Sequence, residues 1–321
     1  MNSGPIDIAQ LVSEAHERIR PYLRKTMLVQ SHYYSEQSGA NIFFKCENLQ
    51  HTGSFKARGA MNKLLSLSEE ERKKGVVTAS TGNHGAAVAY ALQHIAARGI
   101  VFVPETASQS KTAKIERLGA EVRYFGQDSA KTEGYARQFA IQEGMTYVSP
   151  YNDPQIIGGQ GTVGFELERQ LETIDAVFVS LGGGGLISGI AGYLKNHNPN
   201  IHIVGCSPIH SQVMIKSVRA GEILDLPSQP TLSDGTAGGV EPDSITFKLC
   251  LELVDDYCVV TEDEIATSLR EFISAQHMLI EGSAAVAIAS SLQQQERFEG
   301  KNVVIVLCGA NISLTTLKEI L

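Results

Sequence analysis

The chain has 321 residues, which is long enough to bury a sizeable core in one or two domains. Its formal net charge of −8 gives no basic footprint for nucleic acid or an anionic membrane. No apolar run reaches the ~18 residues of a membrane span, and the polar N-terminus lacks a signal-peptide core. We therefore expect a soluble, cytoplasmic protein that binds neither nucleic acid nor membranes. The five cysteines are odd in number and lack CxxC spacing, so they indicate neither a disulfide framework nor a zinc site.

The first part of the chain contains two helical patterns with a strand pattern between them. Apolar residues three and four positions apart predict a helix within residues 1–25, closed by Pro21. Residues 41–47 have the pattern of a buried strand, which leads into residues 53–60, where a second helix begins. This order places Lys56 at a helix N-terminus directly after a strand.

From residue 75 onward, short apolar strands and helical stretches alternate. The first strands are predicted at residues 76–79, 99–103, 121–125 and 147–148. We predict that residues 75–148 form a small domain and that residues 1–74 and 149–321 form a large one. Further strands are predicted at residues 176–179, 201–205, 257–260 and 303–307. Short apolar strands separated by helices are typical of α/β folds with parallel sheets covered on both faces.

Lys56 lies in a run of small residues, which is unusual for an ordinary surface lysine. Gly53, Ser54, Ala57 and Gly59 let another group approach the backbone closely, and a desolvated lysine amine is a nucleophile. Lysines are rarely buried, however, so an exposed lysine at a helix start explains the spacing equally well.

Four consecutive glycines, Gly182 to Gly185, follow a predicted strand and precede a helical pattern. Their amides can converge on an anion, to which the helix dipole adds partial positive charge. A dinucleotide-binding loop needs G-x-G-x-x-G and an acidic residue about 20 positions later. Here Ser188 follows instead, and the next strand ends at Cys206 and Ser207 without a carboxylate. Together with Lys56, the loop favours the phosphate of a pyridoxal cofactor over a dinucleotide or a simple tight turn.

Two further motifs follow strand patterns: Ser-Thr-Gly-Asn-His-Gly at residues 80–85 and Cys-Gly-Ala-Asn at residues 308–311. Ligands of parallel sheets bind beyond the carboxyl ends of the strands, where all four motifs fall. In this order the motifs resemble those of fold type II pyridoxal-phosphate enzymes, above all threonine and serine dehydratases and serine racemases. The resemblance extends from about Leu23 to the C-terminus. It implies a tryptophan synthase β-like fold with two open, twisted, mostly parallel sheets flanked by helices.

The resemblance assigns pyridoxal 5'-phosphate to a set of residues. It implies that Lys56 binds the cofactor covalently, that Phe55 lies beside the ring and that Asn83 bonds to the phenolic oxygen. The residues implied to bind the phosphate are Gly182, Gly183, Gly184, Gly185 and Leu186. Most relatives have serine facing the pyridine nitrogen where this chain has Cys308. A neutral partner there favours prompt β-elimination, and a buried structural thiol is the alternative.

The resemblance also implies which residues bind the substrate carboxylate. They are Ser80, Thr81, Gly82, Asn83 and His84. Amides and hydroxyls at a helix N-terminus can hold a carboxylate in a fixed plane. At the position of Thr81, serine racemases have a serine that acts as the second acid or base, on the face of the substrate opposite the lysine. The hydroxyl of Thr81 permits this role, whereas its methyl group could hinder the geometry. Helix capping by Asn83 and a structural role for His84 are the alternatives.

Other positions are less diagnostic. Glu281 and Ser283 match a family stretch near the cofactor ring, and Asp234-Gly235 resembles a loop beside the substrate. A helix cap and a turn are the alternatives for these two stretches.

No metal is expected from the sequence. Several serine racemases bind a divalent cation through a glutamate and an aspartate at positions where this chain has Ser207 and Val213. Because these hard oxygen ligands are missing, we expect no magnesium or calcium there.

The favoured hypothesis is a lyase that converts L-threonine or L-serine to a 2-keto acid and ammonia by β-elimination, with Lys56 as general base. One alternative is a serine or aspartate racemase that uses Lys56 and Thr81. Others are a dehydratase for a bulkier 3-hydroxy amino acid, such as 3-hydroxyaspartate or phenylserine, and a nucleotide-binding α/β protein without catalysis. Relatives are commonly dimers, which implies a homodimer, and the small domain is expected to close over the substrate.

Overall fold

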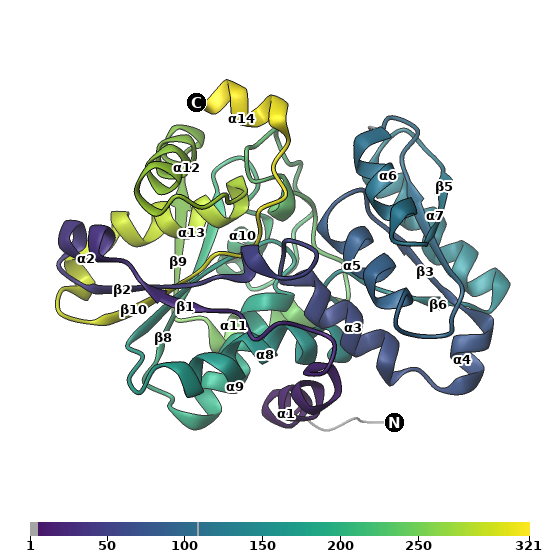
Figure 1. Cartoon of the computed structure of the whole chain (residues 1–321), viewed down its shortest axis with the longest axis horizontal. Coiled ribbons are helices and arrows are strands. Elements are labelled where there is room, and N and C mark those ends of the chain that lie inside the picture. The colour runs from purple at the N-terminus through teal and green to yellow at the C-terminus, as the bar shows by residue number, and fades with distance from the viewer. Residues whose placement is uncertain (1–5, 108) are drawn as a thin grey trace.

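The computed structural model describes residues 6–107 and 109–321, which form two β-sheets with helices on both faces (Figure 1). The larger sheet has the strand order β1-β2-β10-β7-β8-β9, and the smaller has the order β5-β4-β3-β6. Only β1 and β2 pair in antiparallel fashion among the described strands; the other pairs are parallel. The predicted α/β class with two mostly parallel sheets is confirmed.

The strands of the described residues are short, as parallel strands in such folds usually are. Their bounds are β1 Leu28–Gln30, β2 Asn41–Lys45, β3 Val76–Ala79, β4 Gly99–Val103, β5 Glu121–Tyr124, β6 Thr146–Tyr147, β7 Ala176–Ser180, β8 His202–Pro208, β9 Asp256–Val260 and β10 Asn302–Val306.

The α-helices fall mostly between these strands along the chain. Their bounds are α1 Ile8–Ile19, α2 His32–Ser38, α3 Lys56–Ser66, α4 Glu69–Lys74, α5 Asn83–Leu92, α6 Gln109–Arg117, α7 Ser129–Glu143, α8 Pro154–Gln170, α9 Gly185–His197, α10 Val213–Ala220, α11 Ile245–Leu253, α12 Glu262–Gln276, α13 Gly282–Gln293 and α14 Leu314–Ile320. Short 3₁₀ turns lie at Glu47–Leu49, Asp234–Thr236 and Gln295–Phe298.

Helices cover both faces of the large sheet, so its central strands are buried. Helix α13 packs on β7 to β10, with α12 behind it, while α9, α8 and α1 lie on the opposite side (Figure 1). The close approach of α8 and α9 depends on Gly189, where a Cβ atom would lie only 2.4 Å from the Ile157 carbonyl oxygen. The strands β7 and β10 therefore present apolar side chains on both faces, which explains their uninterrupted apolar runs.

Helix α3 connects the two sheets. It packs against α5 of the small-sheet layer and against α8 of the large-sheet layer. Met61 and Leu64 of α3 share a buried cluster with Val88 of α5 and Ile156 of α8. Because Lys56 is the first residue of this helix, it lies where the two layers meet.

A buried group of four charges lies beneath α3. The Arg58 guanidinium bonds to Glu47 and to Glu166, at 2.8 Å in each case, and the Lys45 amine lies 2.5 Å from Glu166. All four side chains are buried. Burial alone raises the pKa of Glu166, but the charges of Arg58 and Lys45 outweigh it and lower the pKa overall. Two cations and two anions thus compensate one another in the core.

The predicted strands recur in the structure with shifted ends, whereas strand β1 and several helices, α2 among them, had no prediction of their own. The strand expected at residues 201–205 is β8, which runs from His202 to Pro208. Strand β1 and helix α2 gave no pattern, because β1 has only three residues at the sheet edge and α2 buries only Tyr34. Within the described residues, no helix is both long and apolar enough to cross a membrane.

Candidate active site

The segment that contains Lys56 lies beside the loop that follows β10. The Phe55 amide donates to the Cys308 carbonyl at 3.1 Å, and Ser54 forms an isolated β-bridge with Gly309. Parallel pairing of β10 with β2 brings the two segments to the same edge of the large sheet. Two of the predicted motifs, distant along the chain, therefore lie side by side.

The Lys56 side chain has a perturbed amine. Its Nζ atom donates to the Pro150 carbonyl at 2.7 Å. Burial lowers the pKa of this amine from its ordinary 10.5 to about 8, although Cys308 and Glu281 nearby act in the opposite direction. An amine with this pKa is partly neutral near pH 7, and the neutral form is the nucleophile.

The glycine loop links the end of β7 to the start of α9. Gly184 has a φ of +85°, which glycine adopts without the cost that another residue would incur. A Cβ atom on Gly183 would lie 2.4 Å from the Tyr151 ring, so the loop passes too close to this ring to carry a side chain. The first N–H groups of α9 have no partner inside the helix. The loop thus leaves backbone N–H groups free at a helix N-terminus, an arrangement that suits an anion.

The Ser80 loop lies at the end of β3 in the small sheet. The Ser80 hydroxyl accepts from the Gly82 amide at 3.2 Å, and Gly82 is the N-cap of α5, which begins at Asn83. Capping by Asn83, the alternative weighed from the sequence, is therefore wrong: the Asn83 side chain makes other contacts. Ser80, Thr81, Gly82, Asn83 and His84 line one cavity together with Lys56.

His84 is a buried and neutral member of this loop. Its Nε2 atom lies 3.0 Å from the Val148 carbonyl oxygen, while Nδ1 has no hydrogen-bond partner among the described residues. Burial lowers the pKa of the imidazole to about 3, and the Lys56 charge adds to this effect. Because His84 lines the cavity, a bound ligand could form a hydrogen bond with Nδ1.

Glu281 is the acidic group at the centre of the site. The Asn83 side-chain amide lies 3.0 Å from each Glu281 carboxylate oxygen, and the Asn311 backbone amide donates to one of them at 3.0 Å. Glu281 occupies the N-cap position of α13, but its side chain forms no cap hydrogen bond. The sequence provided only a weak indication of this residue. The alternative of a helix cap is wrong for the side chain, because the carboxylate does not bond to the backbone of α13.

Cys308 is buried and lies beside Glu281. Its sulfur is 4.0 Å from Glu281 Oε1, and burial raises the pKa of the thiol well above 9. The group is therefore neutral. Ser283, the other weak prediction on this stretch, accepts from the Ser233 hydroxyl at 3.3 Å and lines the same inner cavity as Cys308.

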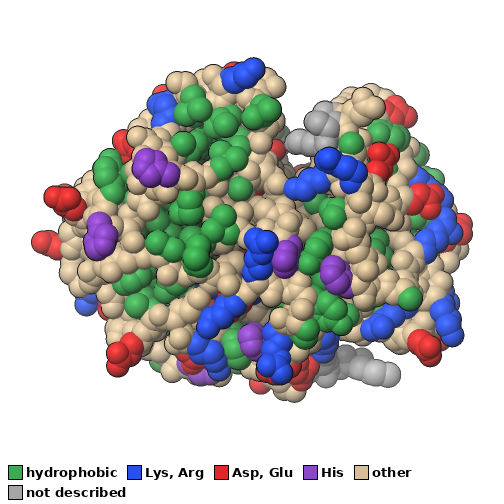
Figure 2. All heavy atoms as spheres, viewed as in Figure 1, with side chains coloured by type: hydrophobic (Ala, Val, Ile, Leu, Met, Phe, Trp, Pro, Cys, Tyr) green, Lys and Arg blue, Asp and Glu red, His purple; other side chains and the backbone are tan. Residues whose placement is uncertain are grey.

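Two adjoining cavities bring the predicted residues together. The outer one has a volume of about 460 Å³ and contains the Ser80 loop; the inner one is narrow and contains the glycine loop, Phe55 and Cys308. Lys56, Asn83, Gly235 and Glu281 line both. The two cavities therefore form one continuous site between the sheets, where Figure 2 shows the outline hollowed between the two lobes.

Several lining residues had not been predicted from the sequence. They are Lys114, Pro150, Tyr151, Asn311, Ile312 and Ser313. Asn311 ends the Cys-Gly-Ala-Asn motif but had been given no role, and Tyr151 carries no spacing signal of its own. Lys114 lies on α6, and only the packing of the two layers brings it to the site.

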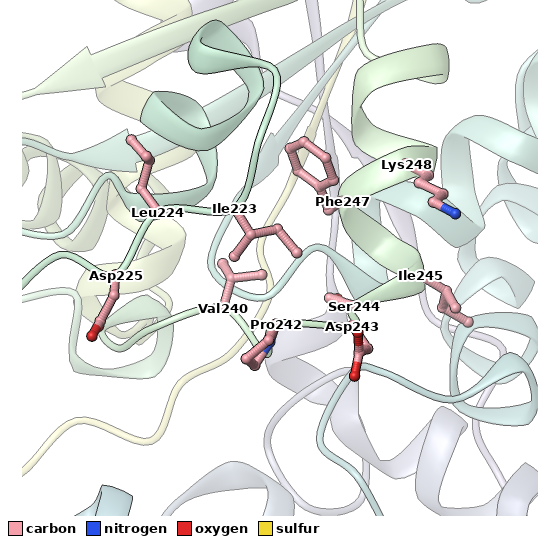
Figure 3. A pocket seen from close by; sticks show the side chains of 10 residues that line it. All are labelled: Ile223, Leu224, Asp225, Val240, Pro242, Asp243, Ser244, Ile245, Phe247 and Lys248. Atoms are coloured by element: carbon pink, nitrogen blue, oxygen red, sulfur yellow. The ribbon is translucent and has the colours of Figure 1, made fainter.

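A larger cavity of about 710 Å³ lies beside α11 (Figure 3). Its wall combines apolar side chains such as Ile223, Val240 and Phe247 with the carboxylates Asp225 and Asp243. None of the predicted site residues lines it. We assign it no catalytic role.

The positions compared with a cation site carry no ligand set. The Ser207 hydroxyl donates to the Leu181 carbonyl at 2.8 Å, and Val213 is buried at the start of α10. Within residues 6–107 and 109–321, no group of three or more His, Cys, Asp or Glu side chains could hold a metal ion.

The residues of the inner cavity fit pyridoxal phosphate. The glycine loop at the start of α9 supplies amides for a phosphate, and the Lys56 amine supplies a nucleophile for an aldehyde. Cys308, a buried neutral thiol, is compatible with a ring nitrogen beside it. Side chains at Gly182 and Gly183 would fill this space: their Cβ atoms would lie 2.9 Å from the Thr236 carbonyl oxygen and 2.4 Å from the Tyr151 ring.

Comparisons with known proteins agree with this geometry. Residues 19–309 match the model of the family described as pyridoxal-phosphate dependent enzyme. An L-threonine ammonia-lyase of Thermotoga maritima is 39% identical over 312 residues, which cover 97% of this chain and 77% of the relative. A catabolic L-threonine dehydratase of Staphylococcus aureus is 36% identical over 329 residues, which cover 100% of this chain and 95% of the relative.

The fold is shared with solved structures as well. The structure of maize serine racemase superposes with a TM-score of 0.93 at 32% identity, and the match covers 98% of this chain and 97% of that one. The predicted fold type II architecture is confirmed by these matches. The chain belongs to the family of pyridoxal-phosphate dependent enzymes.

Proposed function

We propose that the protein is an ammonia-lyase that converts L-threonine or L-serine to a 2-keto acid and ammonia. The observation that carries the proposal is the Lys56 amine, with its lowered pKa, between the glycine loop and the Ser80 loop. The activities named for the Thermotoga and Staphylococcus relatives support β-elimination as the reaction.

The inner cavity would hold the cofactor through residues already named. Lys56 would bind it covalently, Phe55 would lie beside the ring, and Asn83 would donate to the ring oxygen. The backbone amides of residues 182–186 would hold the phosphate. Cys308 would face the ring nitrogen as a neutral thiol. When bound, the cofactor supplies an electron sink for the electron pair left on the substrate α-carbon.

The outer cavity would hold the substrate. The N-terminus of α5, with the Ser80 and Thr81 hydroxyls, would bind the substrate carboxylate and fix its plane. His84 stays neutral at physiological pH, so it neither repels the substrate amine nor adds a charge. The Lys56 amine would accept the α-proton at Nζ, since its pKa of about 8 suits a general base near neutral pH.

The domain assignment is part of this proposal. Residues 75–148 would form a small domain that closes over the substrate, and residues 1–74 and 149–321 a large domain that holds the cofactor. The small sheet, with β3 to β6 between Val76 and Tyr147, supports these boundaries. Closure of this kind excludes water from the reacting groups.

We further propose that the enzyme is a homodimer in the cytoplasm. Strand β1 is an edge of the large sheet, and the exposed Met27 and Tyr33 flank it. Figure 2 shows hydrophobic side chains gathered on the viewed face of the large lobe. All five cysteines are free and buried, which suits a reducing compartment.

Racemisation is a second candidate because of Thr81. This half-buried residue lines the cavity of Lys56, and its hydroxyl could serve as acid or base on the other face of the substrate. The match to maize serine racemase supports this candidate. D-serine formed from L-serine at a rate comparable to 2-keto acid release would favour it over simple elimination.

The proposal is tested by incubating the cofactor-loaded protein with L-threonine and with L-serine and following 2-keto acid release. Release from either substrate, with ammonia in equal amount, is the expected result. If neither product forms from either substrate, the proposed activity is wrong.

A further inference from the structure

Among the described residues that line the outer cavity, Lys114 is the one cation besides Lys56. It lies on α6, in the layer of the small sheet, and its side chain is half-buried. The Nζ atom donates to the Asn311 side-chain oxygen at 2.8 Å and to the Thr52 carbonyl at 3.2 Å. Both acceptors belong to the layer of the large sheet, so Lys114 reaches across the mouth of the site.

The ammonium group of Lys114 has capacity for another partner. A lysine has three N–H donors, and the two acceptors that it contacts are neutral. No ion pair of Lys114 is seen in the part of the chain that the structure describes. By contrast, other half-buried lysines of the protein lie against carboxylates: Lys63 is 2.6 Å from Asp153, and Lys195 is 2.7 Å from Asp255. Lys114 is thus a partly desolvated cation at the cavity wall. No carboxylate of the described residues forms an ion pair with it.

A short chain of hydrogen bonds joins Lys114 to the reacting centre. Asn311, which accepts from Lys114, donates to the Asn83 side-chain oxygen at 2.5 Å, and Asn83 contacts Glu281. One side chain therefore separates the Lys114 amine from Asn83, the proposed contact of the cofactor ring. A substrate at the ring would lie within reach of Lys114 through its own side chain.

Two carboxylates, those of Glu281 and Asp234, line the same cavity and would repel an anionic ligand. Glu281 is the nearer influence on Lys114, but its oxygens already accept from Asn83 and from the Asn311 amide. Burial raises the pKa of Glu281 to about 6, which reduces its charge in mildly acidic conditions. Asp234 lies on the 3₁₀ turn that follows β8 and α10, and like Gly235 it lines the outer cavity from the layer of the large sheet, whereas Lys114 lines it from α6. The positive end of the cavity is therefore the α6 side, where Lys114 lies.

We infer that Lys114 binds a carboxylate on the side chain of the substrate, so that the preferred substrates are 3-hydroxy amino acids with an anionic side chain, such as 3-hydroxyaspartate. The inference rests on the proposed β-elimination and adds a class of substrate that the site would prefer to L-threonine and L-serine. A cavity of about 460 Å³ has space for a second carboxylate beyond the β-carbon. A charge-assisted hydrogen bond from the free N–H of Lys114 would then select this substrate over L-serine.

The reaction balances in the same way as for L-serine. The bond from the α-carbon to hydrogen breaks and the proton passes to Lys56 Nζ. The bond from the β-carbon to oxygen then breaks, the electron pair of the α-carbon forms the double bond to the β-carbon, and the hydroxyl takes up the proton from Lys56 Nζ and leaves as water. The released enamine tautomerises to an imine, which water hydrolyses to oxaloacetate and ammonia. The net change is the conversion of 3-hydroxyaspartate to oxaloacetate and ammonia, without an oxidant or a reductant.

The test compares two variants with the wild-type holoenzyme. Lys114→Gln keeps an N–H donor for Asn311 and Thr52 but removes the charge, and Lys114→Arg keeps the charge. The readout is the ratio of kcat/KM for L-3-hydroxyaspartate, as its threo and erythro diastereomers, to kcat/KM for L-serine. Lys114→Gln should lower this ratio on the order of 10- to 100-fold, through KM more than kcat, and Lys114→Arg should retain most of it. A structural role alone would lower both constants and leave the ratio unchanged, which would overturn the inference.

Inhibitor binding provides a second readout that needs no turnover. Succinate carries two carboxylates and butyrate carries one, so the wild type should bind succinate more tightly, and Lys114→Gln should remove the difference. Exposed Lys74→Met is the matched control and should change neither measurement. If L-serine reacts but succinate binds no better than butyrate, the inference fails and the proposed function stands. If no substrate releases a 2-keto acid but succinate binding depends on Lys114, the proposed function fails and the anion site stands.

Discussion

The Asn83 side-chain amide lies 3.0 Å from both carboxylate oxygens of Glu281 and thereby joins the start of α5 to the start of α13. These helices belong to different sheet layers. The contact is therefore a direct connection between the layer that would bind the substrate carboxylate and the layer that would hold the cofactor. Burial raises the pKa of Glu281 to about 6, against the opposing hydrogen bond from Asn83.

The pH dependence of stability should carry the signature of Glu281. Because folding raises the pKa of this carboxyl from 4.5 to about 6, the folded protein holds the proton more tightly. The resulting stabilisation is present below pH 4.5 and is lost as the pH rises to about 6. Glu281→Gln should therefore remove a decrease of about 2 kcal/mol in the free energy of unfolding between these pH values. Urea denaturation of the cofactor-free protein at pH 4.5 and pH 7 measures this change in the free energy of unfolding. The exposed Glu252→Gln variant is the control. If Glu281→Gln shows the same change as the wild type, the raised pKa of Glu281 is contradicted.

Covalent attachment of the cofactor should report the pKa of Lys56. Only the neutral amine attacks an aldehyde, so the rate should rise with pH and level off above about 8, where the amine is deprotonated. Stopped-flow absorbance of the cofactor-free protein mixed with pyridoxal phosphate follows this rate. A midpoint near 10.5, the value of an exposed lysine, would show that the amine is not desolvated.

Stability should depend on all four buried charges beneath α3. Arg58→Met removes one of two cations and leaves Glu47 and Glu166 in the core with Lys45 alone. Breaking a buried pair in this way typically costs ~3–5 kcal/mol of unfolding free energy. Urea denaturation provides the measurement, and Lys74→Met, which breaks the exposed pair with Glu70, should leave the midpoint unchanged. A loss in Arg58→Met no greater than in this control would show that the network contributes little.

The glycine loop should not accept a side chain at residue 183. A Cβ atom there would lie 2.4 Å from the Tyr151 ring, so Gly183→Ala must displace the ring or the loop. Overpacking of ~1–3 kcal/mol should weaken binding of pyridoxal phosphate by roughly 10-fold, measured by fluorescence titration of the cofactor-free protein. The double variant Gly183→Ala, Tyr151→Ala should recover part of the affinity. If the single variant binds as well as the wild type, the loop does not hold the phosphate.

Much of the site could be predicted because its motifs are local. Lys56, Gly182 to Gly185 and Cys308 each lie within a few residues of a strand end, and parallel strands bring such ends to one edge of a sheet. The same reasoning placed the Ser80 loop at the end of β3.

The missed residues depend on packing rather than on sequence spacing. Tyr151 is fixed by its closeness to Gly183, and Lys114 reaches the site only because α6 faces the loop of Asn311. Helix capping, the alternative considered for Asn83, fails because Gly82 takes that position and the side chain of Asn83 bonds to a residue almost 200 positions away. Interactions between layers of this kind leave no periodic pattern. Strand β1 was missed for another reason: three residues at a sheet edge are too few for an alternation to appear.

The most direct test of the account compares 2-keto acid release by the cofactor-loaded wild type and by Lys56→Ala, with L-threonine and L-serine as substrates. Lys73→Ala, which removes an exposed lysine of α4, serves as the control. The account predicts 2-keto acid and ammonia in equal amounts from the wild type and the control, and a rate lower by at least about a thousandfold in Lys56→Ala. Turnover by Lys56→Ala at the wild-type rate would contradict it.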